Sequence, residues 1–146
     1  MSREGYEAPD VTDSALVSVP VRCGGMSAFD DVTALPPLPI WDGLVARAVH
    51  GERLTLAVVE VEPNAPLPEH SHDNEQLGMV IRGSLTLRVG EEERELGPGE
   101  TWRIAPNVPH SGQAGSDGAV VVDVFGPPRA DWSTVTPLEE QPPRWP

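Results

Sequence analysis

Cysteine is almost absent from the sequence, and this excludes several kinds of chemistry. Cys23 has no partner for an internal disulfide, and there is no Cys-x-x-Cys pair for metal binding or redox exchange. Long apolar runs are also absent, since none approaches the roughly 18 residues that a membrane helix needs. The first residues, MSREGYEAPD, lack the features of a signal peptide. These absences predict a cytoplasmic domain.

Positive charge is scarce as well. The 146 residues include 10 Lys and Arg against 23 Asp and Glu, which gives a formal net charge of −13. A field of this sign repels phosphate backbones and anionic membrane surfaces. We therefore expect neither nucleic acid nor a membrane as a partner.

Glycine and proline are abundant, and no segment of ten or more residues keeps a helical period. The chain has 14 Gly and 17 Pro, which is high for a helical bundle and typical of short strands joined by turns. Strands at about ten-residue spacing predict an all-β sandwich or small barrel. The predicted strands are Gly43–Ala48, Leu54–Glu62, Gln76–Arg82, Ser84–Val89, Glu93–Leu96, Thr101–Ile104, Ser111–Ala114 and Ala119–Phe125.

Composition divides the chain into three zones. Residues 1–39 are polar and irregular and are predicted to be a partly ordered N-terminal extension, in which Ala15–Val21 is a candidate edge strand for its own domain or a partner subunit. Residues 40–126 carry the strands and form the predicted domain. Residues 127–146 hold two Pro-Pro pairs and two tryptophans, and such a tail is expected to pack against the domain without regular structure.

The histidines are few, and two of them stand two residues apart. They are His50, His70, His72 and His110. In an extended segment, residues i and i+2 point to the same side, so His70 and His72 can face one interior point. His50 lies beside Gly51 at a predicted hairpin end and is expected to be exposed.

The same parity selects a further candidate ligand. Gln76 continues the face of His70 and His72 if the chain stays extended, whereas Glu75 falls on the other face, and a bulge in between would reverse this. His110 follows Pro109, where the chain is held extended. Three imidazoles and one oxygen are a familiar ligand set for one divalent zinc, nickel, manganese or iron ion.

Two stretches resemble the two cupin motifs. They are PEHSHDNEQLGMVIRG (68–83), with His70, His72 and Gly83, and ELGPGETWRIAPNVPHSG (95–112), with Pro98, Gly99 and His110. Gln76 occupies the position at which most cupins place glutamate. The resemblance implies a small double-stranded antiparallel β-barrel, the jelly roll, with the metal inside.

The closing segment VVVDVFGPPR (120–129) is similar to the end of the KdgF-type cupins, pectin-degradation proteins that act on unsaturated monouronates. The resemblance spans about residues 40–132 and implies that Asp123, Phe125 and Arg129 line the metal pocket. Asp123 would then transfer a proton, Arg129 would bind a substrate carboxylate and Phe125 would shape the wall. A different interpretation is that Asp123 caps the Pro-Pro turn and Arg129 merely pairs with it on the surface.

The predicted ligands His70, His72, Gln76 and His110 are all neutral, so a bound ion keeps its full charge and acts as a strong Lewis acid. Together with the KdgF-type resemblance, this favours non-redox ring opening and tautomerisation of an unsaturated uronate, a small oxygen-rich acid. The alternatives are a cupin dioxygenase, a cyclase or isomerase of secondary metabolism, and a ligand-binding cupin without catalysis. Small cupins commonly dimerise, so the resemblance also implies a homodimer.

Overall fold

The computed structural model describes residues 27–146; the expected edge strand at Ala15–Val21 and the lone Cys23 lie outside the described residues. The described part consists of strands and two short 3-10 helices. In chain order the elements are η1 (Val32–Ala34), β1 (Leu38–Trp41), β2 (Leu44–His50), β3 (Thr55–Val61), β4 (Pro66–His70), β5 (Glu75–Val89), β6 (Glu92–Leu96), β7 (Thr101–Ile104), β8 (His110–Gly126) and η2 (Ala130–Thr134). No helix of residues 27–146 is long and apolar enough to cross a membrane.

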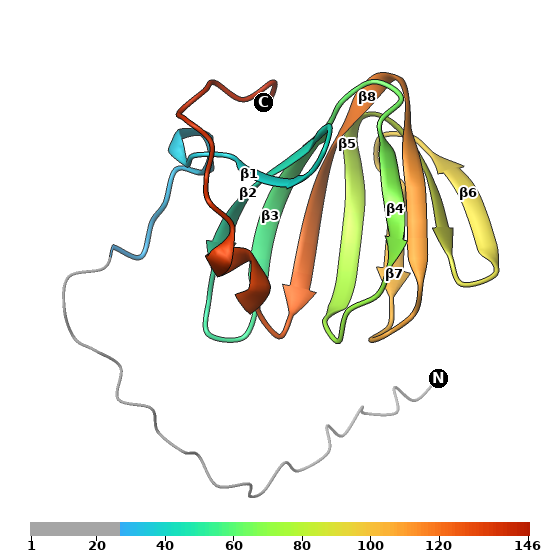
Figure 1. Cartoon of the computed structure of the whole chain (residues 1–146), viewed down its shortest axis with the longest axis horizontal. Coiled ribbons are helices and arrows are strands. Elements are labelled where there is room, and N and C mark those ends of the chain that lie inside the picture. The colour runs from blue at the N-terminus through green and yellow to red at the C-terminus, as the bar shows by residue number, and fades with distance from the viewer. Residues whose placement is uncertain (1–26) are drawn as a thin grey trace, which may run out of the picture.

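The strands pair antiparallel around two long central strands, β5 and β8 (Figure 1). The main path runs β1-β2-β3-β8-β5-β6, while β4 pairs with β8 and β7 pairs with β5. Each long strand therefore belongs to two layers: the first half of β5 lies between β7 and the second half of β8, and its second half lies beside β6. This arrangement confirms the predicted all-β antiparallel class.

The two long strands differ from the sequence prediction, which divided each of them at a glycine turn. Gly83 and Gly118 both have positive φ, 77° and 73°, and they face each other where the β5–β8 register shifts. A Cβ on Gly83 would lie 2.0 Å from the Gly118 carbonyl oxygen, so only glycine allows this close approach. The glycines thus form a bulge that bends a continuous ladder instead of a turn that ends it.

The bulge also reverses which residues of β5 face inward. Before it, the even-numbered Gln76 and Val80 are buried, whereas after it the odd-numbered Leu85 and Leu87 are buried. A one-residue shift moves a strand's side chains to the opposite face. Both halves of β5 therefore line the same interior, which the pattern of either half alone does not reveal.

Two of the strands were not predicted from the sequence, because both contain proline. Leu38–Trp41 and Pro66–His70 each contain proline, yet β1 ends the sheet order and β4 pairs with β8 alone among the described strands. Proline is tolerated at such positions because an edge strand has amide groups that need no ladder partner. β4 matters most, since it ends at His70.

The segment after β8 returns across the outer face of β2 and β3 (Figure 1). Arg47 is 1% exposed and donates to Glu60 Oε2 at 2.8 Å, to the Gln141 carbonyl at 2.8 Å and to the Leu35 carbonyl at 3.0 Å. The other Glu60 oxygen accepts from the backbone amide of Arg144. This cover explains why β3 is buried on both faces and reads as a nearly continuous apolar run.

Candidate metal centre

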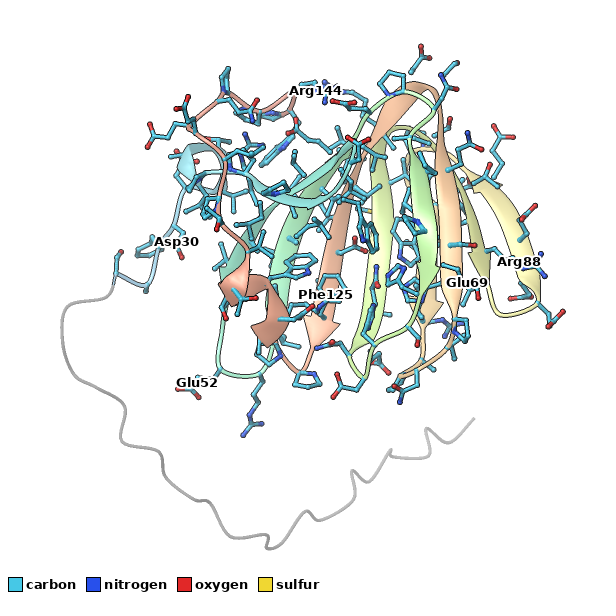
Figure 2. The ribbon with its side chains drawn as sticks, viewed as in Figure 1. Asp30, Glu52, Glu69, Arg88, Phe125 and Arg144 are labelled. Carbon is cyan, nitrogen blue, oxygen red and sulfur yellow. The ribbon has the colours of Figure 1, made fainter. Side chains whose placement is uncertain are left out.

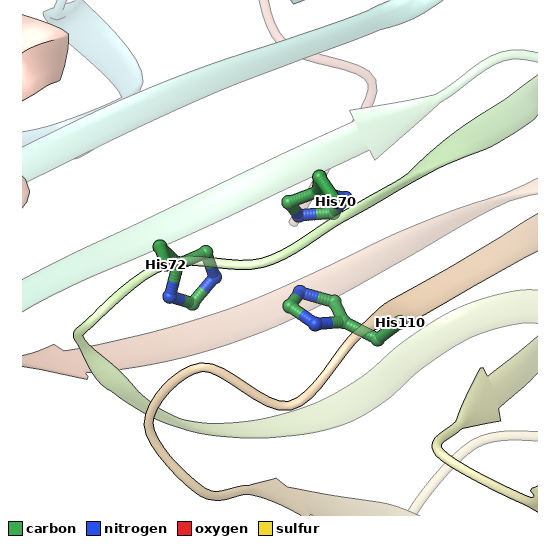
Figure 3. A group of neighbouring side chains, drawn as sticks. All are labelled: His70, His72 and His110. Atoms are coloured by element: carbon green, nitrogen blue, oxygen red, sulfur yellow. The ribbon is translucent and has the colours of Figure 1, made fainter.

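Three histidines from two strands and a loop converge at one end of the interior (Figure 3). His70 ends β4 and is paired in register with His110, the first residue of β8, while His72 lies just beyond β4. Their ring centroids are 4.1 to 5.6 Å apart. One ligand atom from each ring lies within 4.8 Å of the others, a spacing that suits a single shared ion.

Backbone carbonyls fix the protonation of each ring. Nδ1 of His70 lies 2.8 Å from the Pro68 oxygen, Nδ1 of His110 lies 2.8 Å from the Val108 oxygen, and Nδ1 of His72 lies 3.0 Å from the Asn74 oxygen. A carbonyl only accepts, so each Nδ1 carries the proton and each Nε2 keeps its lone pair. Carbonyls that orient a ring in this way are typical of metal-binding histidines.

Two of the Nε2 atoms are buried without a partner. Nε2 of His72 and Nε2 of His110 make no hydrogen bond to the described residues. A buried polar atom without a partner is costly, so its presence calls for an explanation such as an ion. The cluster therefore fits a divalent metal, held through three neutral nitrogens.

Burial also lowers the pKa of all three imidazoles. The pKa of His70 falls to about 4, chiefly because burial disfavours the charged form, and neighbouring His110 and His72 add to the shift. Burial is the main cause of the lowered pKa of His72 and His110 as well, and the nearby Arg129 guanidinium acts in the same direction. The rings are thus neutral at pH 7, the state that binds a metal.

Gln76 faces the histidines, whereas Glu75 is exposed. This is the orientation that parity predicts, although residues 71–74 form a loop instead of an extended strand. Asn74 anchors this loop by donating to the carbonyls of Pro127 and Pro128. Gln76 donates to Asp123 Oδ1 at 2.8 Å, which leaves its own amide oxygen free of that contact.

Asp123 is a buried carboxylate inside the fold, 6% exposed. Burial raises its pKa to about 6, against the opposing effects of the Gln76 amide, the Trp102 indole and the Arg129 charge. Trp102 Nε1 lies near Asp123 but outside hydrogen-bond geometry with any described acceptor. The indole reaches this point because Gly78, which pairs with both residues, has no side chain: a Cβ there would lie 2.1 Å from the indole ring.

Arg129 lies at the rim of the same interior. Its Nε and Nη2 donate to the two carboxylate oxygens of Asp131 at 3.0 and 2.8 Å. Its guanidinium carbon lies over the rings of Phe125 and Trp132, at 4.9 and 4.7 Å from their centroids. The surface interpretation is therefore wrong for both groups, since Arg129 is 9% exposed and pairs with Asp131, while Asp123 bonds to Gln76 and caps no turn.

One internal cavity of about 60 Å³ is lined by His70, His110, Gln76, Asp123 and Arg129, and His72 belongs to the same histidine cluster at its edge. Phe125 forms part of its wall, 2% exposed, and Figure 2 shows this side chain lying between the strands. The volume suits an ion with a few water molecules. His50 lies outside the cavity as expected: it is exposed at the end of β2, and its Nδ1 contacts Thr55 Oγ1 at 2.8 Å.

Three aromatic or acidic neighbours of the site were missed in the sequence. Trp41 packs edge-on against the His70 ring at 4.5 Å between centroids, Trp102 approaches Asp123, and Asp131 holds Arg129. Trp102 falls inside the second motif and alternates with the exposed Thr101 and Arg103, which is a signal of burial. Trp41 and Asp131 carry no comparable pattern, because their positions depend on β1 and η2 folding back over the site.

A family comparison decides the identity of this architecture. The family model described as "Cupin domain" matches residues 57–125, a span that includes the three clustered histidines, Gln76 and Asp123. The chain contains a cupin domain. Its all-β fold is accordingly the jelly roll of that family.

Two curated proteins are similar to this cupin. The pectin degradation protein KdgF of Dickeya dadantii is 29% identical over 106 residues, which cover 71% of this chain and 94% of the relative. The H2HPP isomerase of Bacillus subtilis is 34% identical over 89 residues, 59% of this chain, and the match spans only 37% of that enzyme. The solved structure of KdgF from a Halomonas species has a TM-score of 0.61 at 25% identity and covers 65% of this chain and 88% of its own.

Proposed function

We propose that this cupin is a metal-dependent enzyme that opens the ring of a 4,5-unsaturated uronate and tautomerises it to the linear keto acid. One observation carries the proposal: three neutral imidazoles lie around a common point, and the cavity beside them also contains a buried carboxylate, Asp123, which accepts a hydrogen bond from Gln76. The similarity to two KdgF proteins supports the choice of a sugar acid as the substrate class.

His70, His72 and His110 would hold the ion through Nε2, and the amide oxygen of Gln76 is the fourth candidate ligand. A divalent ion in this neutral set supplies Lewis-acid polarisation of substrate oxygens. The candidate metals are zinc, nickel, manganese and iron, since imidazole nitrogen and amide oxygen suit all four.

Asp123 is the proposed proton carrier. The reaction is an isomerisation. The anomeric hydroxyl loses its proton while the bond between C1 and the ring oxygen breaks, which gives an aldehyde at C1; C4 then gains a proton while the former ring oxygen becomes the C5 ketone, so the atoms balance with no second reactant. A carboxylate whose pKa is raised to about 6 is ionised at pH 7 yet basic enough to accept a proton and return it. The Gln76 amide orients Asp123 through the 2.8 Å bond to Oδ1.

Arg129 is the proposed carboxylate-binding residue. The metal and Arg129 together bring more positive charge than Asp123 balances, and an anionic substrate would restore the balance. Asp131 already occupies Nε and Nη2, so a substrate carboxylate meets the Nη1 side of the guanidinium. A sugar acid exceeds the 60 Å³ cavity, which places most of its ring at the rim, near Arg129 and the Phe125 wall.

The test follows the loss of absorbance of unsaturated galacturonate on metal-loaded protein. We expect the Asp123→Ala variant to be about 10²–10⁴-fold slower and the His70→Ala/His72→Ala double variant to be inactive. His50→Ala, which removes a histidine outside the cavity, is the matched control and should retain the wild-type rate. Equal rates in all variants would refute the mechanism, and substrate-dependent oxygen uptake at an electrode would indicate the dioxygenase alternative instead.

We also infer that the cupin forms a homodimer through the outer face of β3, β8 and β5. Four large apolar side chains on this face are 38 to 45% exposed: Leu56, Leu77, Met79 and Ile81. The register places Leu56 and Leu77 on either side of Val124, so the side chains form one continuous apolar patch. An exposed patch of this kind marks an interface, and a second copy of the same patch is a complementary partner.

A further inference from the structure

A second hollow, the β6–β7 groove, lies between the edges of those two strands and has a volume of about 510 Å³. Leu87, Leu96 and Trp102 line it, and Leu87 and Trp102 also line the histidine cavity. These two side chains are therefore a shared wall between the groove and the candidate metal centre. The groove is far larger than the cavity and holds none of the clustered histidines.

One wall of the groove is apolar because the inner face of β6 extends past the short β7. Leu87 pairs with Arg94 and Leu85 pairs with Leu96, so Arg94 lies on the same face of β6 as the buried Leu96. β7 covers only the first half of β5, opposite Gln76 to Met79. Trp102 of β7 and Leu87 of β5 thus meet solvent at the groove, although each is less than one-tenth exposed.

The charge of the groove is unusual for this chain. Arg94 and Arg103 both line it, and neither forms an ion pair or a side-chain hydrogen bond with any residue of 27–146. Arg94 projects from the inner face, whereas Arg103 comes from the edge of β7. In a protein with 23 acidic residues and a net charge of −13, two unpaired guanidinium groups beside an apolar wall leave a positive charge that an anion can meet.

We propose that the β6–β7 groove binds a small organic anion with a flat apolar body. The body packs on Trp102 and Leu87, and its carboxylate pairs with Arg94, with Arg103 at the opposite rim. Glu92, on the same face of β6 as Arg94, limits the site to one anionic group by repelling a second. The site is separate from the proposed uronate reaction and needs no metal.

The test uses 1-naphthoate as the probe, with 1-naphthamide as its neutral counterpart and acetate as the charge without the body. Calorimetry on the wild type should show saturable 1-naphthoate binding that is about tenfold or more tighter than binding of the other two compounds. Arg94→Gln should weaken 1-naphthoate by a similar factor. Arg88→Gln is the matched control, because Arg88 pairs with Glu93 on the opposite face of the same ladder and is exposed (Figure 2).

A second readout locates the probe. The chain has four tryptophans, and the indole N–H signal that disappears in Trp102→Phe is the one that 1-naphthoate should shift most in the NMR spectrum. Binding should persist in the His70→Ala/His72→Ala variant, which separates the groove from the metal centre. The proposal is overturned if 1-naphthoate fails to saturate, if Arg94→Gln binds it as the wild type does, or if the histidine variant alone abolishes binding.

Discussion

The side-chain amide of Gln76 donates a 2.8 Å hydrogen bond to Asp123 Oδ1 across the β5–β8 pair. Most cupins have glutamate at the position of Gln76, and a carboxylate there would face Asp123 with a like charge. The amide therefore lets Asp123 ionise in a buried site.

Gln76→Glu should raise the pKa of Asp123 further, by about one unit or more, because two adjacent carboxylates resist ionising together. In the proposed reaction the acid limb of the pH–rate profile should move to higher pH, and activity at pH 7 should fall. The matched control is Glu75→Gln, an exposed neighbour on the other face of β5. An unmoved acid limb in Gln76→Glu would contradict the assignment of Asp123 as the proton carrier.

Asp123→Asn should stabilise the metal-free protein at neutral pH. The folded-state pKa of Asp123 is about 6 and its ordinary value is 3.8, so between those values the folded protein holds a proton that the unfolded chain releases. The free energy of unfolding of the wild type therefore falls as the pH rises from about 4 to 6. Asparagine does not ionise, so the variant should not show this decrease. The gain in unfolding free energy should be on the order of 3 kcal/mol at pH 7 and nearly absent near pH 4, measured by urea denaturation at each pH. A pH-independent difference between the two proteins would show that Asp123 titrates normally.

Removal of metal by a chelator should lower the melting temperature, and zinc or nickel should restore it. An ion that binds only the folded state stabilises it by mass action, and two buried Nε2 atoms gain a partner. The His70→Ala/His72→Ala variant should melt at the same temperature with and without metal. His50→Ala should respond as the wild type does. A metal response that survives in the double variant would place the ion elsewhere.

Leu77→Lys should convert the dimer to a monomer without unfolding it. Leu77 is 45% exposed on the outer face of β5, so lysine fits there in the single chain but places a charge inside the proposed interface. Light scattering after gel filtration should give the mass of two chains for the wild type and of one for the variant. Ser116→Lys, exposed on β8 and outside the apolar patch, is the charge-matched control and should leave the mass unchanged. A wild-type mass of one chain would refute the dimer.

The sequence predicts the bounds of a strand well where buried and exposed side chains alternate. It predicts them poorly where the backbone conformation of a glycine determines whether a strand continues or ends. Thr101–Ile104 has the predicted bounds, because buried Trp102 and Ile104 alternate with exposed neighbours. The merging of two predicted strands into β5 depends on Gly83, whose positive φ permits a bulge or a turn equally well. Pairing with β8 makes Gly83 a bulge and not a turn, and the position of β8 beside β5 depends on contacts between residues far apart in the sequence.

The histidine cluster could likewise be predicted only in part, since some of it depends on local spacing and the rest on long-range strand pairing. The spacing of His70 and His72 predicts a shared direction, since it is a local property of an extended chain. That His110 pairs in register with His70 depends on β4 crossing to β8, a contact between residues 40 positions apart in the chain. The second motif supplied this pairing through family resemblance, whereas Asp131 and Trp41 had no such guide.

The segment that supplies Arg129 to the cavity rim is also the one that Arg47 and Glu60 fasten to the back of the sheet. The same 20 C-terminal residues thus contribute a guanidinium to one side of the sheet and cover a buried ion pair on the other. A substitution at Arg47 would remove two of the contacts that hold this segment in place, namely the hydrogen bond to the Gln141 carbonyl and the ion pair with Glu60.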